Sequence, residues 1–155
     1  MKRLIVSAVL ACVLPVAAAK AESFTFASRN DITNRIVAPV AGSKTIVAQF
    51  STGEIEVTYA SRKVRSTSQC ATWPAPAGST FTVSGACVAK DADGSQFTVV
   101  VSCRAVDEKS TVSDCFGQLT GVSSVYQGKT GTVSWRSTAS GDAKSTSSTG
   151  TGMWN

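Results

Sequence analysis

The segment TFTVSGACVAKDADGSQFTVVVSC, residues 80–103, decides the fold. In both of its halves, apolar and polar residues alternate. The residues that share one side are Phe81, Val83 and Cys87 in the first half, and Phe97, Val99, Val101 and Cys103 in the second. Between the halves, Asp91–Gly94 is rich in residues that form turns. Alternation on both sides of a turn predicts an antiparallel β-hairpin with one buried face.

The same alternation occurs nearer the N-terminus. SFTF at 23–26 places two phenylalanines on one side, and KTIVAQF at 44–50 aligns its isoleucine, an alanine and its phenylalanine. EIEVTY at 54–59 directs its apolar residues one way and its glutamates the other. The short STG at 51–53 is typical of a turn, so we expect 44–59 to form a second hairpin.

The C-terminal region predicts a third hairpin. GTVSWRST at 131–138 and STSSTGTGMWN at 145–155 surround the turn-like ASGDA, and Val133 and Trp135 share a face. Because an aromatic residue at a frayed end would not be buried, we expect the last segment to be a strand that pairs with the first. Its Ser/Thr-rich composition leaves a disordered linker as the alternative. The fold class is therefore all-β, a small antiparallel β-barrel, with a β-sandwich as the alternative.

The N-terminus resembles a bacterial secretory leader. Lys2 and Arg3 precede an apolar stretch from Leu4 to Ala19, and small residues permit cleavage after Ala21. We predict a signal peptide at 1–21 and one all-β domain at 22–155. A lipid anchor at Cys12 is the alternative, but VLAC matches a lipoprotein signal only in part. We expect a periplasmic or secreted protein without a membrane span, because no later stretch has the roughly 18–20 apolar residues of a membrane helix.

The charge argues against a nucleic-acid partner. Without the three basic residues of the leader, the formal net charge falls from +5 to +2. Proteins that bind nucleic acids normally carry a larger basic excess on one face. SRKVR at 61–65 is the one basic cluster after the leader, and its ordinary interpretation is a solvated strand end or loop.

Four cysteines remain after the leader: Cys70, Cys87, Cys103 and Cys115. An even number in an exported chain is typical of disulfide bonds. A Cys87–Cys103 bond is disfavoured, because Cys87 lies near the hairpin turn and Cys103 at the far end of the next strand. Of the remaining pairings we prefer Cys70–Cys87 with Cys103–Cys115, which joins sequence neighbours. Zinc is the competing interpretation, but the chain has no histidine and no Cys-x-x-Cys pair.

The absence of histidine also removes every Ser–His or Cys–His nucleophile and the commonest general base. Glu54 and Glu56 point to the same side of one segment, which is what a solvated strand face looks like. A glycosidase pair usually straddles a cleft from separate elements. We therefore expect no enzyme, no cofactor and no metal.

The C-terminal segments CFGQLTG, YQGKTGTVSW and GTGMWN resemble uncharacterised secreted bacterial proteins in which a Gly-Lys-Thr-Gly strand precedes a final Gly-x-Gly-x-Trp-Asn strand. At the level of fold, the chain looks like calycin-type or allene-oxide-cyclase-type barrels. This resemblance implies a barrel but no activity.

Two functions remain. The first is a non-catalytic barrel that binds a small or extended ligand, with Trp73, Tyr126, Trp135 and Trp154 as aromatic residues that could contact it. The second is a protein-interaction module, such as a protease inhibitor or an envelope factor. It depends on CATWPAPAGS at 70–79, in which two prolines would stiffen a binding loop.

Overall fold

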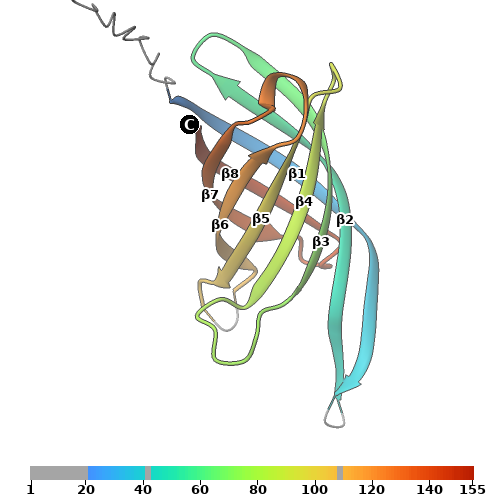
Figure 1. Cartoon of the computed structure of the whole chain (residues 1–155). Coiled ribbons are helices and arrows are strands. Elements are labelled where there is room, and N and C mark those ends of the chain that lie inside the picture. The colour runs from blue at the N-terminus through green and yellow to red at the C-terminus, as the bar shows by residue number, and fades with distance from the viewer. Residues whose placement is uncertain (1–20, 41–42, 108–109) are drawn as a thin grey trace, which may run out of the picture.

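Eight antiparallel strands form a closed barrel in the computed structural model, which describes residues 21–40, 43–107 and 110–155 (Figure 1). Each strand pairs with its neighbours in chain order, and the last pairs with the first. The strands are β1 (Glu22–Val40), β2 (Ser43–Tyr59), β3 (Lys63–Pro74), β4 (Val83–Asp91), β5 (Gln96–Ala105), β6 (Val112–Gly121), β7 (Thr130–Ala139) and β8 (Ser145–Trp154). The predicted barrel is confirmed, and so is the docking of the C-terminal segment as its closing strand.

Residues 1–20 of the leader predicted at 1–21, with Cys12, lie outside the described residues. Within the described part, no helix has the length and hydropathy that a membrane span requires. Among the described residues, the helical structure is a single 3-10 turn, η1 (Ser124–Tyr126), between β6 and β7.

The strands are strongly tilted. Phe24 of β1 pairs with Gly152 of β8, and the register continues through Val133, Gly117, Val101, Gly85, Thr72 and Gln49 before it returns to β1 at Arg35. The circuit starts at Phe24 and ends at Arg35 of the same strand, so following the pairs once around the barrel moves the register well along β1. This displacement shows that each strand is staggered relative to its neighbours. In an eight-stranded barrel, stagger and tilt together set the width of the interior.

Glycines in β8 make room for the large rings that face the interior. A side chain on Gly152 would overlap the Phe24 ring, and one on Gly150 would come within 2.8 Å of the Phe26 ring. Both phenylalanines line the interior, as the SFTF alternation predicts. The Gly-Thr-Gly run of the last strand is thus complementary to the two phenylalanines of the first.

The predicted turn at 51–53 is wrong, because these residues lie inside the continuous strand β2. Gly53 faces a very close neighbour: a Cβ at this position would overlap the carbonyl oxygen of Arg29 on β1. The glycine therefore permits close approach of two backbones and does not reverse the chain.

Beyond the barrel, β1 and β2 continue as a two-stranded ribbon (Figure 1). Its register shifts between Ile36 and Val37, which pair with Ala48 and Ile46 respectively. Val47 is therefore the extra residue of a β-bulge. Ile46 then lies on the face opposite Ala48, so the predicted alignment of these two residues is wrong.

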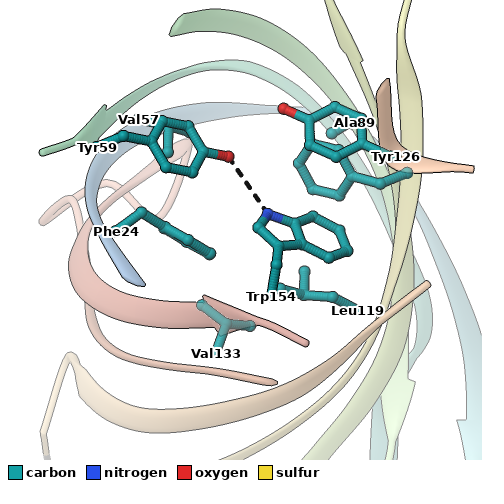
Figure 2. Packing of buried hydrophobic residues seen from close by; sticks show 9 residues of the cluster. Phe24, Val57, Tyr59, Ala89, Leu119, Tyr126, Val133 and Trp154 are labelled. Carbon is teal, nitrogen blue, oxygen red and sulfur yellow. Dashed lines mark hydrogen bonds between the residues drawn. The ribbon is translucent and has the colours of Figure 1, made fainter. Parts of the chain in front are cut away.

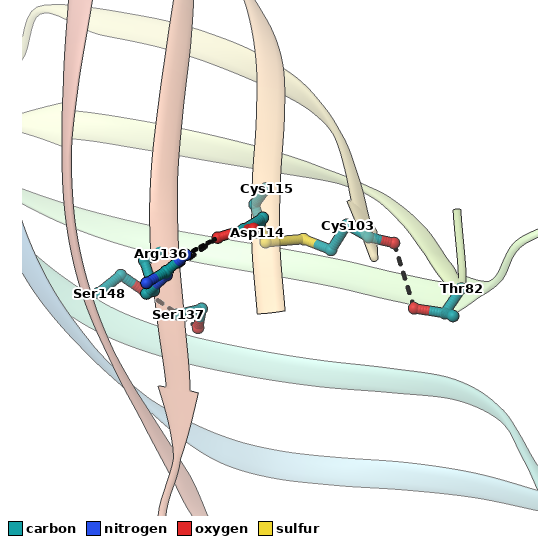
Figure 3. The surroundings of a disulfide bond; sticks show 7 residues. All are labelled: Thr82, Cys103, Asp114, Cys115, Arg136, Ser137 and Ser148. Atoms are coloured by element: carbon teal, nitrogen blue, oxygen red, sulfur yellow. Dashed lines mark hydrogen bonds and ion pairs between the residues drawn. A yellow bond between two sulfur atoms is a disulfide. The ribbon is translucent and has the colours of Figure 1, made fainter. Parts of the chain in front are cut away.

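Both preferred disulfides are present. Cys70–Cys87 joins β3 to β4, and Cys103–Cys115, shown in Figure 3, joins β5 to β6. The Cα–Cα distance is 4.1 Å in each. In both bonds the two cysteines are direct partners across neighbouring strands. The bonds therefore link neighbouring strands on one wall of the barrel.

Candidate functional site

The barrel encloses a cavity of about 260 Å³. Its apolar lining includes Phe26, Ile55, Val99, Val101, Leu119 and Trp135. Its polar lining includes Ser28, Asn30, Gln49, Ser51, Ser68 and Thr72. The inward positions of β1 change from phenylalanine to serine and asparagine along the strand, so the cavity has an apolar end and a polar end.

The apolar end is closed by an aromatic cluster around Trp154, which is 3% exposed (Figure 2). The Trp154 ring lies 5.0 Å from Tyr126 and 5.6 Å from Phe97, measured between ring centroids. Its indole N–H donates a hydrogen bond to the hydroxyl of Tyr59 at 3.3 Å. We therefore expect any ligand to enter through the opposite end, where β3, β5 and β7 end.

A buried carboxylate stabilises the closed end. Asp91 accepts hydrogen bonds from the hydroxyls of Tyr126 at 2.7 Å and Ser66 at 2.6 Å, and its residue is 6% exposed. Burial, and then the bond to Asp91, raise the pKa of Tyr126 well above its usual range. Tyr126 therefore stays protonated and acts as a donor, which suits a structural role in holding η1 against the barrel.

The polar end contains hydrogen-bonded pairs of side chains. The Ser68 hydroxyl donates to the side-chain amide oxygen of Asn30 at 2.8 Å, and the Arg35 Nε–H donates to the side-chain amide oxygen of Gln49 at 3.0 Å. A second Arg35 nitrogen donates to the backbone carbonyl of Ala143, in the connection between β7 and β8. Arg35 thus fixes the Gln49 side chain and links the base of the ribbon to a loop beside this end of the barrel.

Several other polar groups of the cavity are free to bind water or a ligand. Within the described ranges, the hydroxyls of Ser28, Ser51 and Thr72 have no hydrogen-bond partner in the protein. Polar groups that leave water need a partner, so these hydroxyls favour an occupant that can form hydrogen bonds.

The four cysteines all line the cavity, and Cys115 is 2% exposed. Just outside this wall, Arg136 and Asp114 form an ion pair at 3.0 Å beside Cys115, and the Thr82 hydroxyl donates to the Cys103 carbonyl at 3.2 Å (Figure 3). These contacts and the disulfides cross-link neighbouring strands on one side of the cavity.

The four aromatic residues predicted to contact a ligand lie in three places. Trp135 lines the cavity, with its ring edge-to-face against Phe26 at 6.2 Å. Tyr126 and Trp154 lie in the cluster at the closed end. Trp73 is 44% exposed at the end of β3. The structure therefore brings two of them together and places only Trp135 on the cavity wall.

Gln49, Asn30 and Phe26 are cavity residues that the sequence interpretation did not single out. The alternation that aligned the first two phenylalanines continues to Ser28 and Asn30, so it contained the signal for β1. Gln49 lies in phase with Ser51, Ile55 and Val57 on β2, but the predicted turn at 51–53 interrupted this alternation before it reached Gln49.

The carboxylates of Glu54 and Glu56 lie on the outer surface and do not line the cavity. Glu56 forms an ion pair with Lys63 at 3.1 Å, which lowers the pKa of this carboxyl. Among the residues that the structure describes, no group of three or more His, Cys, Asp or Glu could hold a metal ion.

Comparisons with protein-family models, with curated proteins and with solved structures found no match to this chain.

Proposed function

We propose that this protein is an exported, non-catalytic binding barrel that holds a small molecule in its interior. The observation that carries the proposal is the 260 Å³ cavity, closed at one end by Trp154 and lined by both apolar side chains and hydroxyls without partners. Mouths of β-barrels are common ligand sites, and most ligand sites combine an apolar wall with a few polar groups.

A matched pair of variants tests the site. Val99 lines the cavity, whereas its neighbour Val100 is 64% exposed on the outer surface. We expect the neutral fluorophore N-phenyl-1-naphthylamine to bind the unmodified protein with increased emission. Val99→Trp fills the cavity and should weaken this binding at least about tenfold, whereas Val100→Trp should leave it unchanged. Equal binding by two folded variants, or no binding by the unmodified protein, would contradict the proposal.

Export is supported by the leader-like N-terminus and by the pairing of the four remaining cysteines in two disulfides. The intact mass of the protein from its native source, measured before and after reduction, tests this part of the proposal. A mature chain that begins at Glu22, without an acyl chain and with a gain of four hydrogens on reduction, is the expected result. Retention of residues 1–21 or four free thiols would refute it.

A protein-interaction module is the second candidate, because the connection between β3 and β4 is exposed and ordered. Trp73 is 44% exposed, and hydrogen bonds join Ala75 to Thr82 at 3.0 Å and Ser79 to Pro76 at 3.1 Å across the loop. The Cys70–Cys87 bond fixes the strands that lead into it.

Titration of subtilisin and thermolysin with the protein tests the protease-inhibitor form of this candidate. Stoichiometric inhibition that Trp73→Ala weakens would support it. Rapid cleavage within 74–82, or no inhibition of either enzyme, would remove it.

A further inference from the structure

The amide of Gln49 has a fixed orientation at the polar end of the cavity. Arg35 can only donate hydrogen bonds, so the Gln49 oxygen must face its Nε–H, at 3.0 Å. The amide nitrogen of Gln49 is then left with two N–H groups, and no partner for it exists in the described part of the chain. Because Gln49 lines the cavity, these groups form a donor site for a ligand atom that accepts hydrogen bonds.

The cavity contains no charge to match a charged ligand. None of its lining residues is Asp, Glu, Lys or Arg, and the chain has no histidine. Arg35 lies at the edge, but its guanidinium already donates to Gln49 and Ala143. Its charge also acts on Asp142, whose pKa is lowered first by a hydrogen bond from Ser140 and also by Arg35. An ionised group inside the barrel would therefore lose its hydration without a counter-charge.

The opposite end is suited to hydrocarbon. Phe26 and Trp135 form an edge-to-face pair, and Leu119 lies in the apolar cluster beneath Trp154. The volume of 260 Å³ equals that of about nine molecules of liquid water, which is enough for two fused rings with a short substituent.

We infer that the cavity binds a neutral, amphipathic small molecule, with its hydrocarbon part against Phe26 and Trp135 and a carbonyl, ether or hydroxyl oxygen at the Gln49 amide. This inference rests on the proposed function and adds the chemical class of the ligand and its direction in the barrel.

Three probes of nearly equal shape test it by displacing N-phenyl-1-naphthylamine. 2-Acetylnaphthalene has an acceptor oxygen, 2-ethylnaphthalene has none, and 2-naphthoate carries a charge. We expect the acetyl compound to bind about three- to tenfold more tightly than the ethyl compound, because of one added hydrogen bond. The naphthoate should bind at least about 100-fold more weakly than the acetyl compound.

Variants then assign the preference to one group. Gln49→Glu keeps an acceptor for Arg35 but removes both N–H donors, so the preference for acetyl over ethyl should fall to about one. Gln49→Leu should do the same. Gln69→Leu, an exposed glutamine on β3, is the matched control and should retain the preference.

The outcomes separate this inference from the proposed function. If the fluorophore itself does not bind, the proposed function fails. If the fluorophore binds but naphthoate equals or exceeds the acetyl compound, or the acetyl preference survives in both Gln49 variants, the cavity remains a ligand site and the inferred ligand class is wrong.

Discussion

Removal of one hydroxyl should measurably weaken the closed end of the barrel. Tyr126→Phe keeps the ring against Trp154 but deprives the buried Asp91 carboxylate of one of its two side-chain donors, at 2.7 Å. Hydrogen bonds to charged groups contribute about 1.5–3 kcal/mol, and Asp91 is only 6% exposed, so little water can replace the lost donor. We expect the free energy of unfolding to fall by about 2 kcal/mol and the Tm by roughly 6–10 °C.

Urea unfolding, followed by tryptophan emission and circular dichroism, measures this change. Tyr59→Phe is the control: it removes an acceptor that lies 3.3 Å from a neutral indole N–H, and should cost about 1 kcal/mol or less. In an Asp91→Ala background, Tyr126→Phe should cost at least about 1 kcal/mol less than in the unmodified protein. The reasoning is refuted if the free energy of unfolding of Tyr126→Phe differs from that of the unmodified protein by less than about 0.5 kcal/mol, which is about the error of such measurements. It is also refuted if Tyr126→Phe lowers this free energy equally in both backgrounds.

Three further predictions concern the walls of the barrel. The double variant Cys103→Ala/Cys115→Ala should lose about 3 kcal/mol in urea unfolding, because the bond closes a loop with a sequence separation of 12; a loss below about 1 kcal/mol would contradict this. Gly152→Ala should lose about 1–3 kcal/mol, since its methyl group would overlap an inward phenylalanine ring, and unchanged stability would show that the ring moves freely. Lys63→Ala should raise the pKa of Glu56 in an NMR titration, because Lys63 is the main cause of its lowered value. Because the folded-state pKa of Glu56 is lowered, its carboxylate stabilises the fold above the unfolded-state pKa, and this contribution is lost as the pH falls through the folded-state pKa. A Glu56 pKa that does not change in Lys63→Ala would contradict the role given to Lys63.

Local alternation and turn chemistry were sufficient to predict much of the barrel. The hairpin at 80–103 placed Cys87 and Cys103 at different heights on neighbouring strands, which disfavoured one of the three possible pairings, and the preference for sequence neighbours then gave the observed disulfides. The aromatic residue near the end of the last segment indicated a strand that closes on the first, and β8 does pair with β1. In both cases the prediction came from residues within the segment itself and needed no knowledge of distant strands.

The rest depends on how distant strands meet. Gly53 looked like a turn residue, but it is required by the backbone of a neighbouring strand that comes close only in the folded barrel. The positions of Trp135 in the cavity and of Trp154 at its closed end follow from the stagger around the whole circuit, which no single segment determines. Gln49 was missed because the turn predicted at 51–53 broke the alternation that places it on the same face as Ile55 and Val57.

The pairing of β1 with β8 has a consequence for how the chain folds. It joins the first strand of the barrel to the last, from Glu22 opposite Trp154 to Asp31 opposite Ser145. Contacts between residues so far apart in sequence slow folding, and the edge of β1 stays unpaired until β8 docks against it. Until then, that edge can pair with another unfolded chain, so the interval before β8 docks is the one in which this protein is most exposed to aggregation.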